Sequence, residues 1–137
     1  MLRVAVIASL GVAGAAVIAP REANAAYVCG QNQVCIYAGL NETGSVAVES
    51  RLQPGGPGIM NFQNSHFTNG QNLNDAAQSV VNNTVGYLSL CSNLDLTGTC
   101  TIVFPHTTEN LTTVTAENGG FLPVGFIDVA SSAINQS

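Results

Sequence analysis

Hydrophobic residues occur along the chain in short runs that are separated by polar and turn-forming residues. The runs are rich in β-branched and aromatic residues and are bounded by Gly, Asn, Pro or Thr, so each one predicts a β-strand rather than a helix. Short strands at regular spacing predict an all-β antiparallel sandwich. The five predicted strands are Val34–Tyr37, Val46–Val48, Val85–Leu90, Thr101–Phe104 and Gly120–Val124.

A long polar and glycine-rich interval, Gln53–Asn72, separates two of these strands. Loops of this length are usually functional or mobile. We therefore consider it a candidate protein-binding loop, with Phe104–Asn110 as a second. The alternative for the large apolar residues of the first loop is packing in the core or at a sheet edge. As exposed side chains they would be the anchors for a partner: Ile59, Met60, Phe62 and Phe67.

The first residues have the pattern of a signal peptide. Arg3 precedes an apolar run, Val4–Ala19, and the small-x-small sequence Ala23–Ala25 follows. We predict a signal peptide over residues 1–25 and a secreted single domain over residues 26–137, a length sufficient for one hydrophobic core. A membrane anchor is the alternative, but the apolar run is shorter than the roughly 20 residues that a spanning helix requires. We therefore expect no stable membrane insertion after cleavage.

All four cysteines lie in the predicted mature region. An even number of cysteines in an exported chain predicts two disulfides, for which three pairings are possible. We favour the pairing between cysteines that are closest in sequence, Cys29–Cys35 and Cys91–Cys100. A zinc site is the alternative, but intervals of five and eight residues do not match the usual close-set thiolate pairs.

Residues 26–137 are poor in charge, and the charge is negative. Arg51 is accompanied by no lysine and by seven acidic residues. Such a surface has no basic patch that could bind a phosphate backbone, so we exclude nucleic acid as a partner.

We find no catalytic motif. His66 and His106 do not form a metal-binding pair at helical spacing, and the chain has neither a nucleophile elbow nor a phosphate-binding loop. We therefore predict that the protein is not an enzyme.

The sequence contains an internal repeat. The stretches LNDAAQSVVNNT, from Leu73, and FIDVASSAINQS, from Phe126, align at a shift of 53 residues. An earlier pair of stretches aligns at a shift of 54 and matches Gly44 with Gly98, which we expect at positive φ. The pattern predicts two copies of one unit, about residues 29–84 and 85–137. The later stretches pair Asp75 with Asp128, Ala77 with Ala130, Ser79 with Ser132 and Asn82 with Asn135.

The order of elements within each copy resembles a known fold. A strand and a glycine-containing hairpin are followed by NDAAQS, at Asn74–Ser79, or by IDVASS, at Ile127–Ser132. This order resembles the double Greek key of the βγ-crystallins. The opening VCGQNQVCIY and the stretch LNDAAQSVVNNT are similar, more particularly, to the secreted bacterial peptidase inhibitor family I36. The resemblance covers Cys29 to Ser132.

This resemblance implies a disulfide-stabilised, βγ-crystallin-like sandwich of two Greek-key motifs that inhibits an extracellular peptidase, with metalloproteinases as the target class. It also implies calcium sites in which each copy contributes to the site of the other. Gln78 and Ile127 depart from the calcium motif, so we expect at most one weak Ca²⁺ site. Alternatively, the same side chains only stabilise their own turns. The expected ligands are Asn74, Asp75, Asp128 and Ser131.

Two other functions remain open. One is a non-inhibitory structural or weakly Ca²⁺-binding module of the cell envelope, and the other is a secreted toxin or antimicrobial. The acidic surface argues against membrane disruption, which usually depends on basic residues. Apart from weakly bound Ca²⁺ we expect no cofactor.

Overall fold

The computed structural model describes residues 26–112 and 125–137. This part of the chain forms β-strands and one-turn 3₁₀ helices, so the predicted all-β class is confirmed. The strands are β2 (Val34–Tyr37), β3 (Val46–Val48), β4 (Ser79–Asn82), β5 (Tyr87–Cys91), β6 (Cys100–Val103), β7 (Thr107–Asn110) and β8 (Ser132–Gln136); the 3₁₀ helices are η2 (Ser50–Leu52), η3 (Phe62–Asn64) and η4 (Leu94–Leu96).

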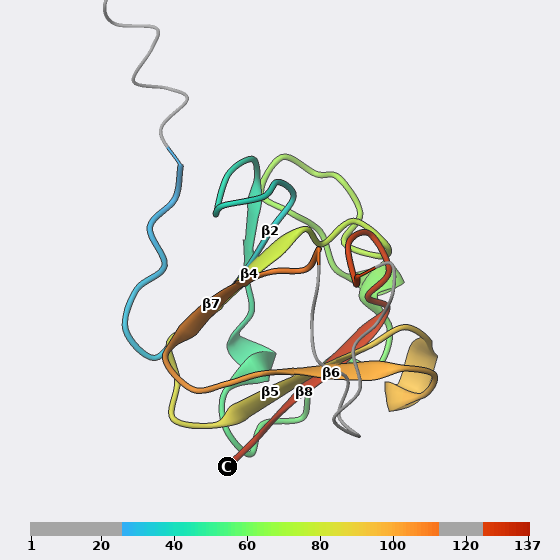
Figure 1. Cartoon of the computed structure of the whole chain (residues 1–137). Coiled ribbons are helices and arrows are strands. Elements are labelled where there is room, and N and C mark those ends of the chain that lie inside the picture. The colour runs from blue at the N-terminus through green and yellow to red at the C-terminus, as the bar shows by residue number, and fades with distance from the viewer. Residues whose placement is uncertain (1–25, 113–124) are drawn as a thin grey trace, which may run out of the picture.

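The strands form two antiparallel sheets that pack as a sandwich (Figure 1). One sheet has the order β3-β2-β4-β7, and the other has the order β6-β5-β8. The arrangement β3-β2-β4 in one sheet is equivalent to β6-β5-β8 in the other. The first three strands come from the first copy of the repeat, and the other three come from the second copy.

Each copy also contributes one segment to the sheet of the other copy. Strand β7 belongs to the second copy but pairs with β4, with Val80 opposite Glu109. In return, Ile59 of the first copy forms a β-bridge with Ala133 of β8, closed by two backbone hydrogen bonds of 2.8 and 2.9 Å. The two copies are therefore intertwined.

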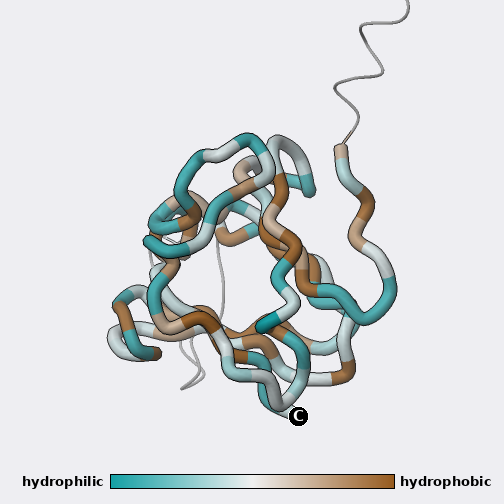
Figure 2. The backbone as a smooth tube through the Cα atoms, turned by 180° about the vertical axis from the view of Figure 1, so that it is seen from behind, coloured by the Kyte–Doolittle hydropathy of each residue, from teal (hydrophilic) through white to brown (hydrophobic). Residues whose placement is uncertain are grey.

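The main core lies between the two sheets. Val34, Ile36 and Val80 face it from one sheet, while Leu88 and Leu90 face it from the other. Hydrophobic stretches of the chain run through the middle of the molecule, and hydrophilic stretches lie mainly at its periphery (Figure 2). This distribution follows from the cost of leaving apolar surface in water, about 25 cal/mol per Å².

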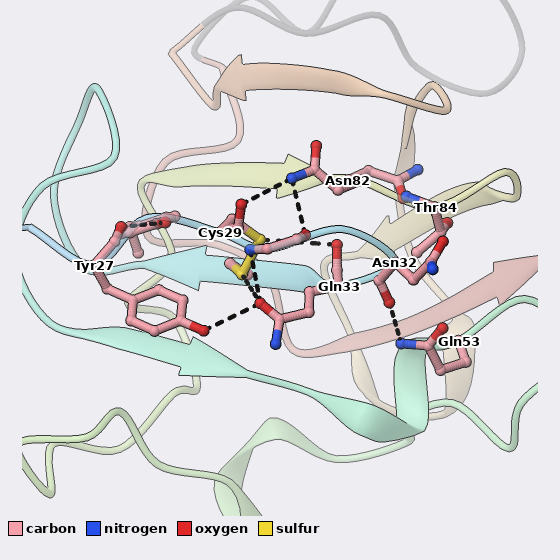
Figure 3. Close-up of a disulfide and its surroundings, with 11 residues drawn as sticks. Tyr27, Cys29, Asn32, Gln33, Gln53, Asn82 and Thr84 are labelled. Atoms are coloured by element: carbon pink, nitrogen blue, oxygen red, sulfur yellow. Dashed lines mark hydrogen bonds between the residues drawn. A yellow bond between two sulfur atoms is a disulfide. The ribbon is translucent and has the colours of Figure 1, made fainter.

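A short N-terminal arm covers the outer face of the four-stranded sheet. Cys29 packs against a second apolar cluster that contains Cys35 and Tyr37, and the Cys29–Cys35 disulfide fastens the arm to β2 (Figure 3). The Tyr37 hydroxyl donates a hydrogen bond of 2.8 Å to the Tyr27 carbonyl. Burial raises the pKa of the Tyr37 phenol, and the carboxylate of Glu42 raises it further. Strand β2 is thus buried on both faces.

Two of the predicted strands match β2 and β3 residue for residue. The predicted strand Val85–Leu90 begins two residues too early, since Val85 is exposed ahead of β5. The prediction Thr101–Phe104 is displaced by one residue from β6, and Gly120–Val124 lies outside the described residues. The polar sequences of β4, β7 and β8 gave no hydrophobic run, so these strands were missed, and β7 occupies much of the candidate loop Phe104–Asn110.

The candidate anchors of Gln53–Asn72 need a correction. Ile59, Phe62 and Phe67 are at most 2% exposed and belong to the main core, and Met60 is half-buried. The backbone of this segment is held against β8 and the residue before it, because the Ile59 amide donates to the carbonyl of Ala133 and the Phe62 amide donates to the carbonyl of Ser131. The interpretation of these three residues as exposed anchors is therefore wrong, and the core alternative is right.

The predicted signal peptide lies outside the described residues. Between Ala26 and Thr112 and between Gly125 and Ser137, no helix is both long and apolar enough to cross a membrane.

Candidate functional site

Two hairpins with the same backbone hydrogen bonds connect the first two strands of each copy. The first hairpin is Ala38–Ser45, between β2 and β3, and the second hairpin is Ser92–Thr99, between β5 and β6. In each hairpin, the amide of the first residue donates a hydrogen bond of 2.9 Å to the carbonyl of the last residue. Inside each hairpin, a threonine hydroxyl donates to the carbonyl three residues earlier. The repeat in the sequence thus corresponds to one repeated local structure.

The tip of each hairpin contains two consecutive residues in the left-handed region of φ. These are Asn41 and Glu42 in the first hairpin and Asp95 and Leu96 in the second, with φ between 54° and 59°. Left-handed backbone is costly for residues that carry a Cβ atom, so the surrounding contacts must hold it in place. The hairpin glycines, Gly44 and Gly98, also have the expected positive φ, 77° and 83°.

A buried serine hydroxyl bridges the second hairpin. The Ser132 hydroxyl donates to the Asn93 carbonyl at 2.6 Å and accepts from the Leu96 amide at 3.0 Å. It therefore satisfies one backbone acceptor and one backbone donor that the left-handed tip leaves without partners inside the hairpin.

The equivalent serine bridges the first hairpin. The Ser79 hydroxyl donates to the Gly39 carbonyl at 2.6 Å and accepts from the Glu42 amide at 3.0 Å. Both serines come from the repeated stretch that ends in β4 or β8. This explains why the sequence repeats a serine at these two positions.

The two hairpins differ at their bases. The Cys91–Cys100 disulfide joins directly opposed residues of β5 and β6, whereas the matching positions of β2 and β3 hold the apolar pair Tyr37 and Val46. The disulfide pairing that we favoured from the sequence, Cys29–Cys35 and Cys91–Cys100, is confirmed. Only the second hairpin is closed by a covalent bond.

The second hairpin presents an apolar side chain to solvent. Leu94 is 40% exposed at its tip, whereas the matching Leu40 of the first hairpin is half-buried. Nothing in the hydrophobic pattern distinguished Leu94 from a core leucine. The disulfide spacing was the available signal, since it predicts a short covalent loop around Leu94.

A second exposed apolar surface lies at the opposite end of the β5–β6 pair. The rings of Tyr87 and Phe104 meet edge to face with centroids 5.8 Å apart, and Val85 is also exposed. Of these three, only Phe104 belonged to a candidate loop in the sequence.

The repeated aspartates form a reciprocal pair of turns. The Asp75 amide donates to the Ala130 carbonyl at 3.0 Å, and the Asp128 amide donates to the Ala77 carbonyl at 2.9 Å. Both aspartates have positive φ, 54° and 56°. Each copy thus fixes the acidic turn of the other.

The acidic turn of the first copy borders a cavity of about 600 Å³ that lies wide open to solvent beside the second hairpin. Inside it, the Asp75 carboxylate accepts a hydrogen bond of 2.9 Å from the side-chain nitrogen of Asn74 and one of 3.2 Å from the hydroxyl of Ser131. The Asn74 side-chain oxygen is buried and has no hydrogen-bond partner among the described residues. The cavity is lined by Gln63, Asn74, Asp75, Ser92, Asn93, Leu94, Asp95, Thr97 and Ser131.

The four predicted calcium ligands do not form one group. Asn74, Asp75 and Ser131 meet in the cavity, but Asp128 lies at the other acidic turn. There, the Gln78 amide nitrogen donates to both Asp128 carboxylate oxygens, at 3.2 and 3.3 Å. Within the described ranges, no three His, Cys, Asp or Glu side chains are grouped so that they could hold a metal ion.

The two histidines are in different parts of the structure, since His66 forms a β-bridge with Asn72 and His106 lies in the turn before β7. His66 and His106 are both exposed, and His106 has a positive φ of 56°.

The fold has a counterpart among solved structures. The chain is similar to a structure described under "Evolution of the eye lens beta-gamma-crystallin domain fold", with a TM-score of 0.56 and 14% sequence identity over 81% of this chain and 94% of that chain. Likeness at this level of identity concerns the fold alone. The predicted βγ-crystallin-like fold is therefore confirmed.

The family follows from the sequence match. Residues 22–103 match the family described as peptidase inhibitor family I36, and the chain belongs to this family. The matched range includes both hairpins and both disulfides. A search of curated proteins found no significant match. The family favours a non-enzymatic protein whose partner is a peptidase.

The serine bridge can be tested with Ser132→Ala. The substitution leaves the Leu96 amide and the Asn93 carbonyl without this partner, so we expect the free energy of unfolding to fall by about 1–3 kcal/mol. Chemical denaturation measures the loss, and hydrogen exchange should show faster exchange of the Leu96 amide. The matched control, Ser79→Ala, should accelerate exchange at Glu42 instead. Unchanged exchange at Leu96 in Ser132→Ala would show that the hydroxyl does not hold the hairpin.

Proposed function

We propose that the protein is a secreted inhibitor of extracellular peptidases and that the second hairpin, Ser92–Thr99, is the surface that contacts the target. Metalloproteinases are the first target class to test, as the family resemblance implies. The observation that carries the proposal is the combination of exposure and covalent closure, because Leu94 is exposed at the tip and Cys91–Cys100 closes the base.

The hairpin is rigid before it binds. Its base is fixed by the disulfide, its tip by the Ser132 hydroxyl, and its interior by the hydrogen bond from the Asn93 amide to the Thr97 carbonyl at 3.1 Å. A loop that is already ordered loses little conformational entropy on association, so more of the contact energy contributes to affinity. This supports a tight complex from a small contact surface.

The same geometry resists cleavage. Asp95 and Leu96 are left-handed, so the tip departs from the extended conformation in which peptides add to a sheet edge. If a peptide bond inside the hairpin were cut, Cys91–Cys100 would still hold both new ends to the β5–β6 pair. The protein would then stay bound as an inhibitor instead of leaving as a product.

The first hairpin supplies an internal comparison. It repeats the backbone structure of the second, but it lacks a disulfide, and a Glu42 stands where the second hairpin has Leu96. Each tip carries one carboxylate, Glu42 or Asp95, but the half-buried Leu40 offers a peptidase less apolar contact area than Leu94 does. The proposal therefore assigns inhibition to one hairpin of the pair.

Titration of a panel of metallo- and serine endopeptidases with the intact, oxidised protein tests the inhibitor function. We expect stoichiometric loss of activity for a metalloproteinase. Leu94→Ala should weaken inhibition about tenfold, the effect of ~1.4 kcal/mol, because it truncates the exposed anchor. Leu40→Ala is the matched control and should inhibit like the unchanged protein. Inhibition by Leu94→Ala as strong as that by the unchanged protein would show that the second hairpin is not the contact surface. Failure to inhibit any enzyme of the panel would contradict the inhibitor function itself.

A weak Ca²⁺-binding structural role is the second candidate, and the cavity at Asp75 favours it. Carboxylate and carbonyl oxygens are the ligands that Ca²⁺ prefers, and the Asp75 carboxylate lies beside the side-chain amide of Asn74 and the hydroxyl of Ser131. The buried Asn74 oxygen without a partner is the kind of group that a bound cation would satisfy. Asp128 does not join this group, because it lies at the other acidic turn and does not line the cavity.

Thermal unfolding in Ca²⁺ and in chelator tests this role. A single site adds about 2.7 kcal/mol of stability when the Ca²⁺ concentration is 100 times the Kd, so the melting temperature should rise with Ca²⁺. Asp75→Asn should abolish the rise, whereas the matched Asp128→Asn should keep it. A rise that survives in Asp75→Asn, or the absence of any rise in the unchanged protein, would contradict a site at Asp75.

A further inference from the structure

We propose that the Asn69–Gly70 bond is a site of spontaneous deamidation in the folded protein, where the asparagine side chain is converted to aspartate or isoaspartate. Asn69 lies in a local structure that recurs in the molecule. Several asparagine side-chain oxygens in the described residues accept a hydrogen bond from the amide two residues later, at 2.8 to 3.1 Å. The four asparagines are Asn61, Asn69, Asn72 and Asn82.

Asn69 differs from the others in the residue that follows it. Gly70 has φ +90°, and no atom lies within 4 Å of the place where a Cβ would stand. Both residues are exposed at the tip of the short turn that the His66–Asn72 bridge closes. The Gly70 amide donates to the Phe67 carbonyl at 2.9 Å, so this one hydrogen bond of the exposed turn must open before hydroxide can remove the amide proton.

The turn also prepares the side-chain amide for attack. The hydrogen bond from the Gln71 amide to the Asn69 Oδ1 folds the side chain back along its own main chain, which places Cγ in the same small ring as the Gly70 nitrogen. Oδ1 is the atom that gains negative charge when a nucleophile adds to Cγ. The Gln71 N–H already donates to this atom, in the manner of an oxyanion-stabilising donor.

The reaction proceeds in two balanced steps. Hydroxide removes the Gly70 amide proton and becomes water, and the nitrogen forms a bond to the Asn69 Cγ. The Cγ–Nδ2 bond then breaks as Nδ2 takes a proton from water and leaves as ammonia, which regenerates hydroxide and produces a cyclic imide. Water then adds to one of the two imide carbonyls and breaks its bond to nitrogen. Addition at the side-chain carbonyl gives aspartate, and addition at the main-chain carbonyl gives isoaspartate.

The other three turns lack at least one requirement. Asn61 and Asn72 precede Phe62 and Leu73, whose side chains are fully buried in the core, so the attacking nitrogen is fixed beside a bulky residue. Asn82 is itself fully buried. Steric freedom at the attacking nitrogen and access to water coincide only at Asn69 among these four residues.

The modification would change a contact between two parts of the first copy. The main-chain amide of Asn69 donates to the Ser45 hydroxyl at 3.0 Å, and this hydroxyl also lies 2.9 Å from the Thr68 hydroxyl. Either product adds a negative charge beside this contact. Isoaspartate also adds one methylene to the main chain, so it should weaken the docking of the turn on the first hairpin.

Ageing of the folded, oxidised protein at neutral and mildly alkaline pH tests the proposal. Samples aged in heavy-oxygen water are digested with an acid protease, since acid suppresses the reaction during digestion, and the peptides are analysed by mass spectrometry. We expect the unmodified Asn69 peptide to disappear and its product to carry one heavy oxygen atom per peptide, and the conversion should be more rapid at the higher pH. Asn61 and Asn72 should remain intact as internal controls.

The Asn69→Gln variant and the reduced, unfolded chain serve as controls. Asn69→Gln should show no conversion at this position, because its longer side chain forms the cyclic imide poorly. In the reduced, unfolded chain the same peptide reports the intrinsic rate. Conversion of Asn69 only after unfolding, or equal conversion of Asn69, Asn61 and Asn72 in the folded protein, would overturn the proposal.

Discussion

The structure depends on the exchange of one segment between the two copies of the repeat. Strand β7 completes the sheet of the first copy through β4, and Ile59 reaches across to Ala133 in the sheet of the second copy. The residues that line the shared core come from both sheets, so neither copy would bury its apolar face alone. The reciprocal bonds from Asp75 and Asp128 fix the register of this exchange.

Within this nearly symmetric framework, the differences between the copies identify the functional candidates. The serine bridges, the left-handed tips and the terminal hydrogen bonds of the two hairpins match closely. The disulfide, the exposed leucine and the open acidic turn all belong to the surroundings of the second hairpin. The proposed binding surface therefore lies where the second copy departs from the first.

The sequence predicted those parts of the fold that depend on apolar runs or on special backbone geometry. β2 and β3 were found because their hydrophobic runs are uninterrupted, and the repeat was found because a serine bridge and a left-handed aspartate restrict the residues at their positions. β4 and β8 were missed because they bury polar residues. Asn82 and Asn135, for example, are fully buried, and their amides donate to backbone carbonyls across the sandwich. Their burial depends on tertiary partners that no local pattern reveals.

The candidate site was predicted less well, for a related reason. Phe62 and Phe67 lie in an irregular segment with no strand or helix period, so the sequence could not show that they face the core. Conversely, Leu94 has the composition of a core residue, and only the disulfide-closed hairpin brings it to the surface. The separation of Asp128 from Asn74 and Asp75 likewise follows from the reciprocal pairing of the turns.

The most direct measurement is amide hydrogen exchange of the protein, free and in complex with a peptidase that it inhibits. The account predicts new protection concentrated in Ser92–Thr99, with little change in Ala38–Ser45, because only the second hairpin makes the contact. Protection confined to the Val85, Tyr87 and Phe104 surface, or equal in both hairpins, would contradict it.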